Sequence, residues 1–194
     1  MGQNSEPQNS KVQRGFKVLN VGDVECCTVK MNCHVEISAY SAYGMCMETP
    51  SKTGIVTVGG ATVWQGQWCG TLPNPRGVTI LQIDPFSCTV EGKSQTFDTH
   101  ISAAAAENLG KYLEQLEDGK VIVGVTGDDP SRRLRNALPA LQQLEVDVGD
   151  IGYRSSFAFV AQKGYKEKTI LDKVLTEGRS HRNPANLDAW IMGT

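Results

Sequence analysis

The sequence predicts an α+β fold in which mostly antiparallel, sandwich-like sheets are flanked by two or three helices. Three observations support this prediction. Short apolar or alternating runs, separated by Gly, Pro and Asn, fill the chain up to about residue 98. Helical spacing of apolar residues begins only after residue 99, and a compact Val/Ile run separates two helical segments. Six cysteines, all at or before Cys88, predict disulfide bonds in the N-terminal half.

The N-terminal half is expected to form short strands. Gly59 and Gly60 separate two Val/Thr-rich runs, and both central residues of a type I′ turn need positive φ, so this pair predicts a hairpin. Residues 1–13 are polar and are expected to form a disordered tail that precedes a single domain over residues 14–194. The expected strands cover residues 16–21, 35–39, 55–58, 61–65, 78–83 and 95–97.

An amphipathic helix is expected over residues 101–117, because apolar residues recur there at helical spacing. Gly119 follows it, where a left-handed residue commonly ends a helix. The Val/Ile run at residues 120–126 is bounded by glycine and is too short for a helix, so it predicts a buried strand.

A second helix is expected after this strand, with Asp129 as its N-cap and Pro130 as its first residue. Pro139 should kink or split that helix, because proline removes a backbone donor. The rest of the chain predicts a strand pair within residues 151–161 and a short terminal helix over residues 169–176.

Charge and hydropathy exclude several functional classes. The formal net charge is −2 and no long basic run is present, so no nucleic-acid partner is expected. No stretch approaches the roughly 18 apolar residues of a membrane span. The N-terminal residues lack the apolar segment of a signal peptide, which is therefore expected to be absent or removed.

The cysteines predict an oxidising compartment and hence a secreted or extracellular protein. A zinc site built from Cys26, Cys27, Cys33, His34 and Cys46 is an alternative, although the spacing lacks paired C-x2-4-C motifs. Buried, reduced cysteines of an intracellular protein are a further alternative. The residues expected to form disulfides are Cys26, Cys27, Cys33, Cys46, Cys69 and Cys88.

No motif for catalysis is present. The sequence lacks the glycine-rich phosphate loops and the G-x-S-x-G elbow, and its three histidines lie in unrelated contexts. We therefore expect neither an enzyme nor a cofactor or metal.

Ligand binding is the better interpretation of three charged residues at expected strand ends. Arg76 and Arg154 precede strands, and Asp128 follows the buried strand. Two guanidinium groups and one carboxylate can bind the hydroxyls of a sugar from both sides. Asp129 and Tyr153 are possible supporting residues, although Asp128 is equally well explained as a turn residue and either arginine as a surface residue. Trp64, Trp68 and Tyr153 are candidates for an aromatic platform, with core packing as the alternative.

Four segments resemble the interleukin-like EMT inducer (ILEI) domain, also called the GG domain. This domain occurs in secreted cytokine-like proteins, in the stem of the enzyme that adds N-acetylglucosamine to O-mannose, and in cell-surface hyaluronan-degrading proteins. The resemblance covers about residues 55–190. The segments are Pro75-Arg76-Gly77-Val78, Phe97-Asp98, Val125 to Pro130 and Gly152 to Gly164.

The resemblance implies an extracellular β-sandwich that has no enzymatic activity and that recognises glycans in some members of the family. The sugar-contacting positions of the family would fall on Arg76, Asp128 and Arg154, which all match. Two features differ. Phe157 replaces the usual tryptophan, and the cysteine pattern differs from that of the cytokine-like members.

The sequence therefore predicts a secreted, non-catalytic, lectin-like domain that recognises a terminal sugar of a glycoprotein or oligosaccharide. The binding of one shallow site would be weak, so assembly into a homo-oligomer would supply avidity. The alternative is a secreted cytokine-like signalling protein that acts through a protein receptor.

Overall fold

The structure is a computed structural model that describes residues 16–20, 31–40, 54–66, 76–148, 151–153, 155–164, 171–175 and 185–193. The expected tail at residues 1–13 lies outside these ranges. None of the described helices is long and apolar enough to cross a membrane.

Two antiparallel sheets form the framework. The first sheet has the strand order β1-β10-β2-β3-β4 and the second sheet the order β6-β5-β7-β8-β9. The strands of the first sheet are β1 (Phe16–Asn20), β2 (Met31–Ala39), β3 (Gly54–Val58), β4 (Ala61–Gly66) and β10 (Ala185–Gly193). Those of the second sheet are β5 (Val78–Asp84), β6 (Thr89–Phe97), β7 (Val121–Thr126), β8 (Ser156–Gln162) and β9 (Leu171–Leu175).

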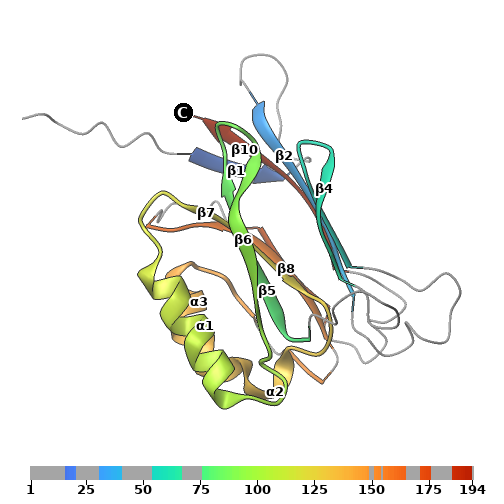
Figure 1. Cartoon of the computed structure of the whole chain (residues 1–194), viewed down its shortest axis with the longest axis vertical. Helices are drawn as coiled ribbons and strands as arrows, with labels where there is room; N and C mark the ends of the chain where they lie inside the picture. Colours follow the sequence, from blue (N-terminus) through green and yellow to red (C-terminus); the bar gives the residue numbers. More distant parts are fainter. Residues whose placement is uncertain are drawn as a thin grey trace, which may run out of the picture.

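The helices cover one face of the second sheet, and the first sheet packs against its other face (Figure 1). They are α1 (Ala103–Gln115), α2 (Ser131–Leu134) and α3 (Leu138–Gln143), with a short 3-10 helix, Arg135–Ala137, between the last two. All residues of β7 and β8 are buried, because these central strands are covered on both faces. The α+β prediction is thus confirmed.

Several elements were predicted correctly from short sequence patterns. Gly59 and Gly60 have φ of 58° and 82° and close the hairpin between β3 and β4, as expected for a type I′ turn. The second helix is split as predicted, and Pro139 lies in the first turn of α3.

Three other predictions need correction. The segment 169–176 contains the strand β9, although its apolar residues have helical spacing, because pairing with β8 overrides this local pattern. Residues 151–161 contribute one strand, β8, and not a pair. Before it, Ser155 forms a turn in which its backbone N–H donates to the Gly152 carbonyl and its hydroxyl accepts from the Gly152 N–H. β6 begins earlier than expected, and β10 was not predicted.

A disulfide between described residues joins the two sheets. Cys33 of β2 is bonded to Cys88, which directly precedes β6. This bond excludes Cys33 as a ligand of the zinc site considered from sequence, and it excludes the reduced state for these two cysteines. The expected disulfides of Cys26, Cys27, Cys46 and Cys69 fall outside the described residues.

Candidate functional site

Four strand ends meet at one edge of the second sheet. Val78 at the start of β5 pairs with Phe97 at the end of β6 and with Thr126 at the end of β7. Because β7 and β8 are also antiparallel, the start of β8 lies at the same edge. The residues that flank these strand ends form what we call the polar edge: Arg76, Asp98, His100, Asp128, Asp129 and Tyr153.

An ion pair stands at the centre of the polar edge. The Arg76 Nε and Nη2 atoms donate to Oδ2 of Asp98 at 2.9 and 2.6 Å. Burial alone would raise the pKa of Asp98, but the hydrogen bonds from Arg76 and from the backbone N–H of Ile101 lower it below its usual value. The bond to Asp98 raises the pKa of Arg76 in turn. Arg76 is therefore held in a fixed orientation, with part of its donor capacity in use.

Asp128 lies near this ion pair, as the sequence predicted for a residue at the end of a buried strand. Its side chain is largely buried, and its negative charge adds to the effects that raise the pKa of Arg76. The structure therefore brings Arg76 and Asp128 to the same edge. Arg154, the third residue of the predicted sugar site, lies outside the described residues.

Asp129 supports the start of the second helix. Its Oδ1 accepts hydrogen bonds from the backbone N–H and the hydroxyl of Ser131, at 2.9 and 2.6 Å. The helix begins at Ser131, so the N-cap is Pro130, and Asp129 lies one residue before the cap instead of at it as predicted. The capping chemistry is nevertheless present, because the carboxylate binds the first free N–H of the helix.

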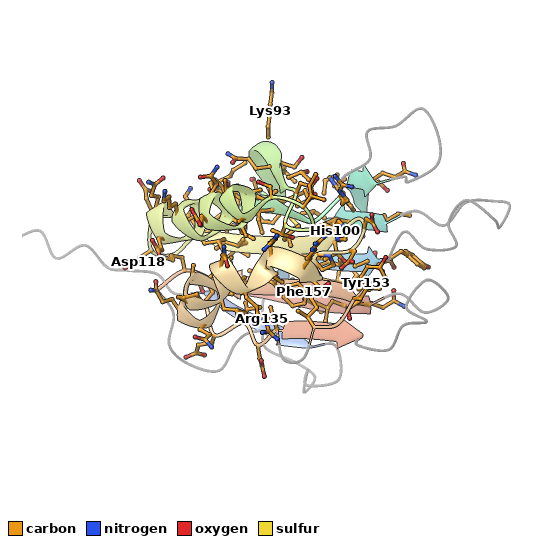
Figure 2. All side chains as sticks on the ribbon, turned by 90° about the horizontal axis from the view of Figure 1, so that it is seen from below. Lys93, His100, Asp118, Arg135, Tyr153 and Phe157 are labelled. Atoms are coloured by element: carbon orange, nitrogen blue, oxygen red, sulfur yellow. A yellow bond between two sulfur atoms is a disulfide. The ribbon has the colours of Figure 1, made fainter. Side chains whose placement is uncertain are left out.

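His100 and Tyr153 extend the polar edge toward solvent. His100 Nδ1 lies 3.2 Å from Oδ2 of Asp129, whose side chain is only 3% exposed. The ring of His100 also faces that of Tyr153, with centroids 6.5 Å apart (Figure 2). Because Thr99 accepts a backbone hydrogen bond from Arg133 and donates its hydroxyl to the Pro130 carbonyl, the loop that carries His100 is tied to the second helix. Tyr153 therefore faces a residue on a loop that these hydrogen bonds hold in place.

The predicted aromatic platform is only partly assembled here. Tyr153 belongs to the polar edge, whereas Trp64 lies on β4 of the first sheet and packs against the core between the sheets. Trp68 lies outside the described residues. Asp98 and His100 were not predicted as site residues, because the pairing of β5 with β6, which places Asp98 beside Arg76, was not predicted from the sequence.

Replacing Asp98 with asparagine is expected to weaken the acid dependence of stability. The folded-state pKa of Asp98 is lowered, so its ion pair stabilises the protein above the unfolded pKa of about 3.9 and loses this effect as the pH falls through the folded pKa. Asp98→Asn should cost about 1 kcal/mol at neutral pH and progressively less below pH 4 or so. Urea unfolding of both proteins at neutral pH and in strong acid checks this. An equal difference at both pH values would contradict it.

Comparison with known proteins gives a family match that contains the polar edge, and also gives several relatives. Residues 76–165 match the family model described as interleukin-like EMT inducer. The human protein named "Cell migration-inducing and hyaluronan-binding protein" is 33% identical over 112 residues, which are 57% of this chain and 8% of that protein. The zebrafish (Danio rerio) "Protein FAM3C" is 30% identical over 69 residues, which are 34% of this chain and 30% of that protein.

This chain therefore spans only a small part of either relative. The family match contains β5 to β8, the helices and every residue of the polar edge. The comparisons therefore support the assignment of residues 76–165 to the interleukin-like EMT inducer family, the family that the sequence resembles.

Proposed function

We propose that this chain is a secreted, non-catalytic signalling domain of the cytokine-like kind, which binds a protein receptor through the polar edge. The observation that carries this proposal is the exposed Tyr153, 63% accessible, whose ring faces His100 in the polar edge that also holds the ion pair of Arg76 and Asp98. Similarity to FAM3C and to the family described as interleukin-like supports the same class of function.

The chemistry of the polar edge is that of a protein-binding surface. Tyrosine and arginine dominate the binding energy of protein interfaces, because they bury large areas and still make hydrogen bonds. Tyr153 supplies such an aromatic group, and Ile101, directly after His100, adds a second exposed apolar side chain. Asp98, held by Arg76, accepts a hydrogen bond from the backbone N–H of Ile101, so the backbone at Ile101 is ordered in advance, which reduces the entropy cost of binding.

Secretion is supported by the disulfide between Cys33 and Cys88. Such bonds persist in oxidising compartments and are rare in the cytosol. The ion pair between Arg76 and Asp98 supports a binding role, because it holds these two side chains in place at the polar edge.

Replacing Tyr153 with alanine is expected to weaken receptor binding about 30-fold, the effect of losing about 2 kcal/mol at an interface hot spot. The measurement is the apparent Kd of the fluorescently labelled protein on cultured cells, by flow cytometry. Phe86→Ala is the matched control, because Phe86 is 62% exposed but lies in the β5–β6 turn, at the opposite end of the second sheet. Equal binding by both variants and the parent would contradict the proposal.

Carbohydrate binding is the second candidate, favoured by the proximity of Arg76 and Asp128 at one sheet edge. Only some of the donors of Arg76 are used by Asp98, so the guanidinium retains hydrogen-bonding capacity for hydroxyl groups. The name of the human relative, which includes hyaluronan binding, supports a glycan ligand.

The same cell assay separates the two candidates. If a protein is bound, protease treatment of the cells should abolish binding and removal of their glycans should leave it unchanged. If a glycan is bound, glycosidase treatment and the Asp128→Asn substitution should both abolish binding, and a glycan array should identify the sugar. Circular dichroism of each variant shows whether it is folded.

A further inference from the structure

The outer face of the first sheet carries a group of polar side chains that the proposed function does not use. Along β2, the side chains of Cys33, Val35 and Ile37 are buried, so the alternate residues face outward. Along β10, Ala189 and Ile191 are buried in the same way. The described helices all pack on the second sheet, so they do not cover this outer face (Figure 1).

Three potential metal ligands come together on this face. Glu36 of β2 stands directly opposite Asp188 of β10, and His34 lies two residues before Glu36 on the same face. One ligand atom of each residue lies within 4.8 Å of the other two. Among the described residues, this is the one group of three or more His, Cys, Asp or Glu side chains with such spacing.

Neighbouring side chains already orient two of the ligands. Thr57, which pairs with Glu36 from β3, donates its hydroxyl to Oε2 of Glu36 at 2.9 Å. The ring of His34 is stacked on that of Trp190, with centroids 4.3 Å apart and an interplanar angle of 17°. Supporting contacts of this kind hold metal ligands in place and raise affinity.

The arrangement also favours a cation on electrostatic grounds. Like charges directly opposite one another on adjacent strands are destabilising, and Glu36 and Asp188 are such a pair. Without metal, a hydrogen bond joins His34 Nε2 and Oδ1 of Asp188, which lie 2.5 Å apart. A divalent cation would supply positive charge between the two carboxylates and would contact all three residues.

We propose that His34, Glu36 and Asp188 bind a divalent transition-metal ion, for which Zn²⁺ is the best match. Imidazole nitrogen and carboxylate oxygen are both zinc ligands, whereas Ca²⁺ and Mg²⁺ prefer oxygen ligands alone. Zinc would replace the hydrogen bond between His34 and Asp188, and the nitrogen and oxygen would move apart to about 3.4 Å, the separation of two ligands of tetrahedral zinc. Water would fill the remaining coordination position.

This site differs from the zinc site considered from sequence. That site combined His34 with Cys33 and other cysteines, but Cys33 faces the core and is bonded to Cys88, whereas His34 faces outward. The ligands proposed here come from two strands that are distant in the sequence but adjacent in the sheet.

Isothermal titration calorimetry of the full, oxidised chain with ZnCl₂ is the first test, with MgCl₂ as comparison. We expect one zinc per chain, and no measurable heat of binding with magnesium. His34→Gln and Asp188→Asn should each weaken zinc binding at least about tenfold. His100→Gln is the matched control, because His100 also faces a carboxylate and is similarly exposed, at 21% against 25% for His34, yet it should leave zinc binding unchanged.

Cobalt substitution tests the identity of the ligands. Co²⁺ bound by nitrogen and oxygen should give weak visible bands that are lost in the Asp188→Asn variant, and it should lack the intense charge-transfer band of thiolate ligands. Circular dichroism shows that the variants are folded. Zinc binding that persists in both variants, cobalt spectra with thiolate bands, or no binding at millimolar zinc would each overturn the proposal and leave the cluster as an ion pair.

Discussion

Replacing Gly77 with alanine is expected to destabilise the protein by about 4 kcal/mol or to prevent folding. Gly77 has φ of +93°, a conformation that L-residues rarely adopt, and a Cβ atom there would lie 2.0 Å from the carbonyl oxygen of Phe97. That oxygen cannot easily move away, because it accepts a hydrogen bond from the N–H of Thr99 at 2.8 Å. The measurement is urea unfolding, followed by circular dichroism.

The Gly119→Ala variant separates backbone strain from steric clash. Gly119 has a nearly identical φ of +91°, but no atom lies within 4 Å of the position that its Cβ would take. This variant should therefore lose only the strain energy, about 1–2 kcal/mol. Equal destabilisation of the two variants would show that the close approach to Phe97 is not decisive.

Gly77 also explains how the polar edge is assembled. It lies between Arg76 and the first residue of β5, and the backbone there passes close to the carbonyl of Phe97. This close approach brings Arg76 to Asp98, the residue that follows Phe97. We therefore expect that the Gly77→Ala variant, if it folds, loses the ion pair as well as stability.

The elements that were predicted correctly are those with a strong local signal. The Gly59-Gly60 hairpin follows from the need for positive φ, and α1 follows from its apolar spacing, with Ser102 as N-cap accepting from the Ala105 N–H. β9 was predicted as a helix because Leu171, Val174 and Leu175 have helical spacing. Its pairing with β8 is a long-range interaction, which a local pattern does not encode.

The candidate site was predictable to the extent that its residues lie at recognisable strand ends. Arg76 and Asp128 flank the most apolar runs of the sequence, so both could be assigned to sheet edges. The roles of Asp98 and His100 depend on which strands are neighbours, and the zinc cluster depends on the register of β2 with β10. β10 itself was not predicted, so Asp188 could not be placed beside Glu36.

Removing the disulfide by the double substitution of Cys33 and Cys88 to alanine is expected to cost about 4 kcal/mol, the loop-closure entropy of a bridge between residues 55 apart. The bond connects β2 of the first sheet to the turn before β6 of the second. Alanine at both positions leaves no unpaired thiol, and urea unfolding in oxidising buffer measures the loss. Peptide mapping of the parent protein confirms the bond.

Two single variants show whether the cross-link or the packing of the sulfur atoms is responsible. Cys33→Ala and Cys88→Ala each break the bond, but Cys33 is almost fully buried whereas Cys88 is only partly buried against the same core. If the cross-link dominates, both single variants should be destabilised nearly as much as the double variant. If the packing of Cys33 dominates, Cys88→Ala should remain within about 1 kcal/mol of the parent, and apolar contacts alone would then hold the two sheets together.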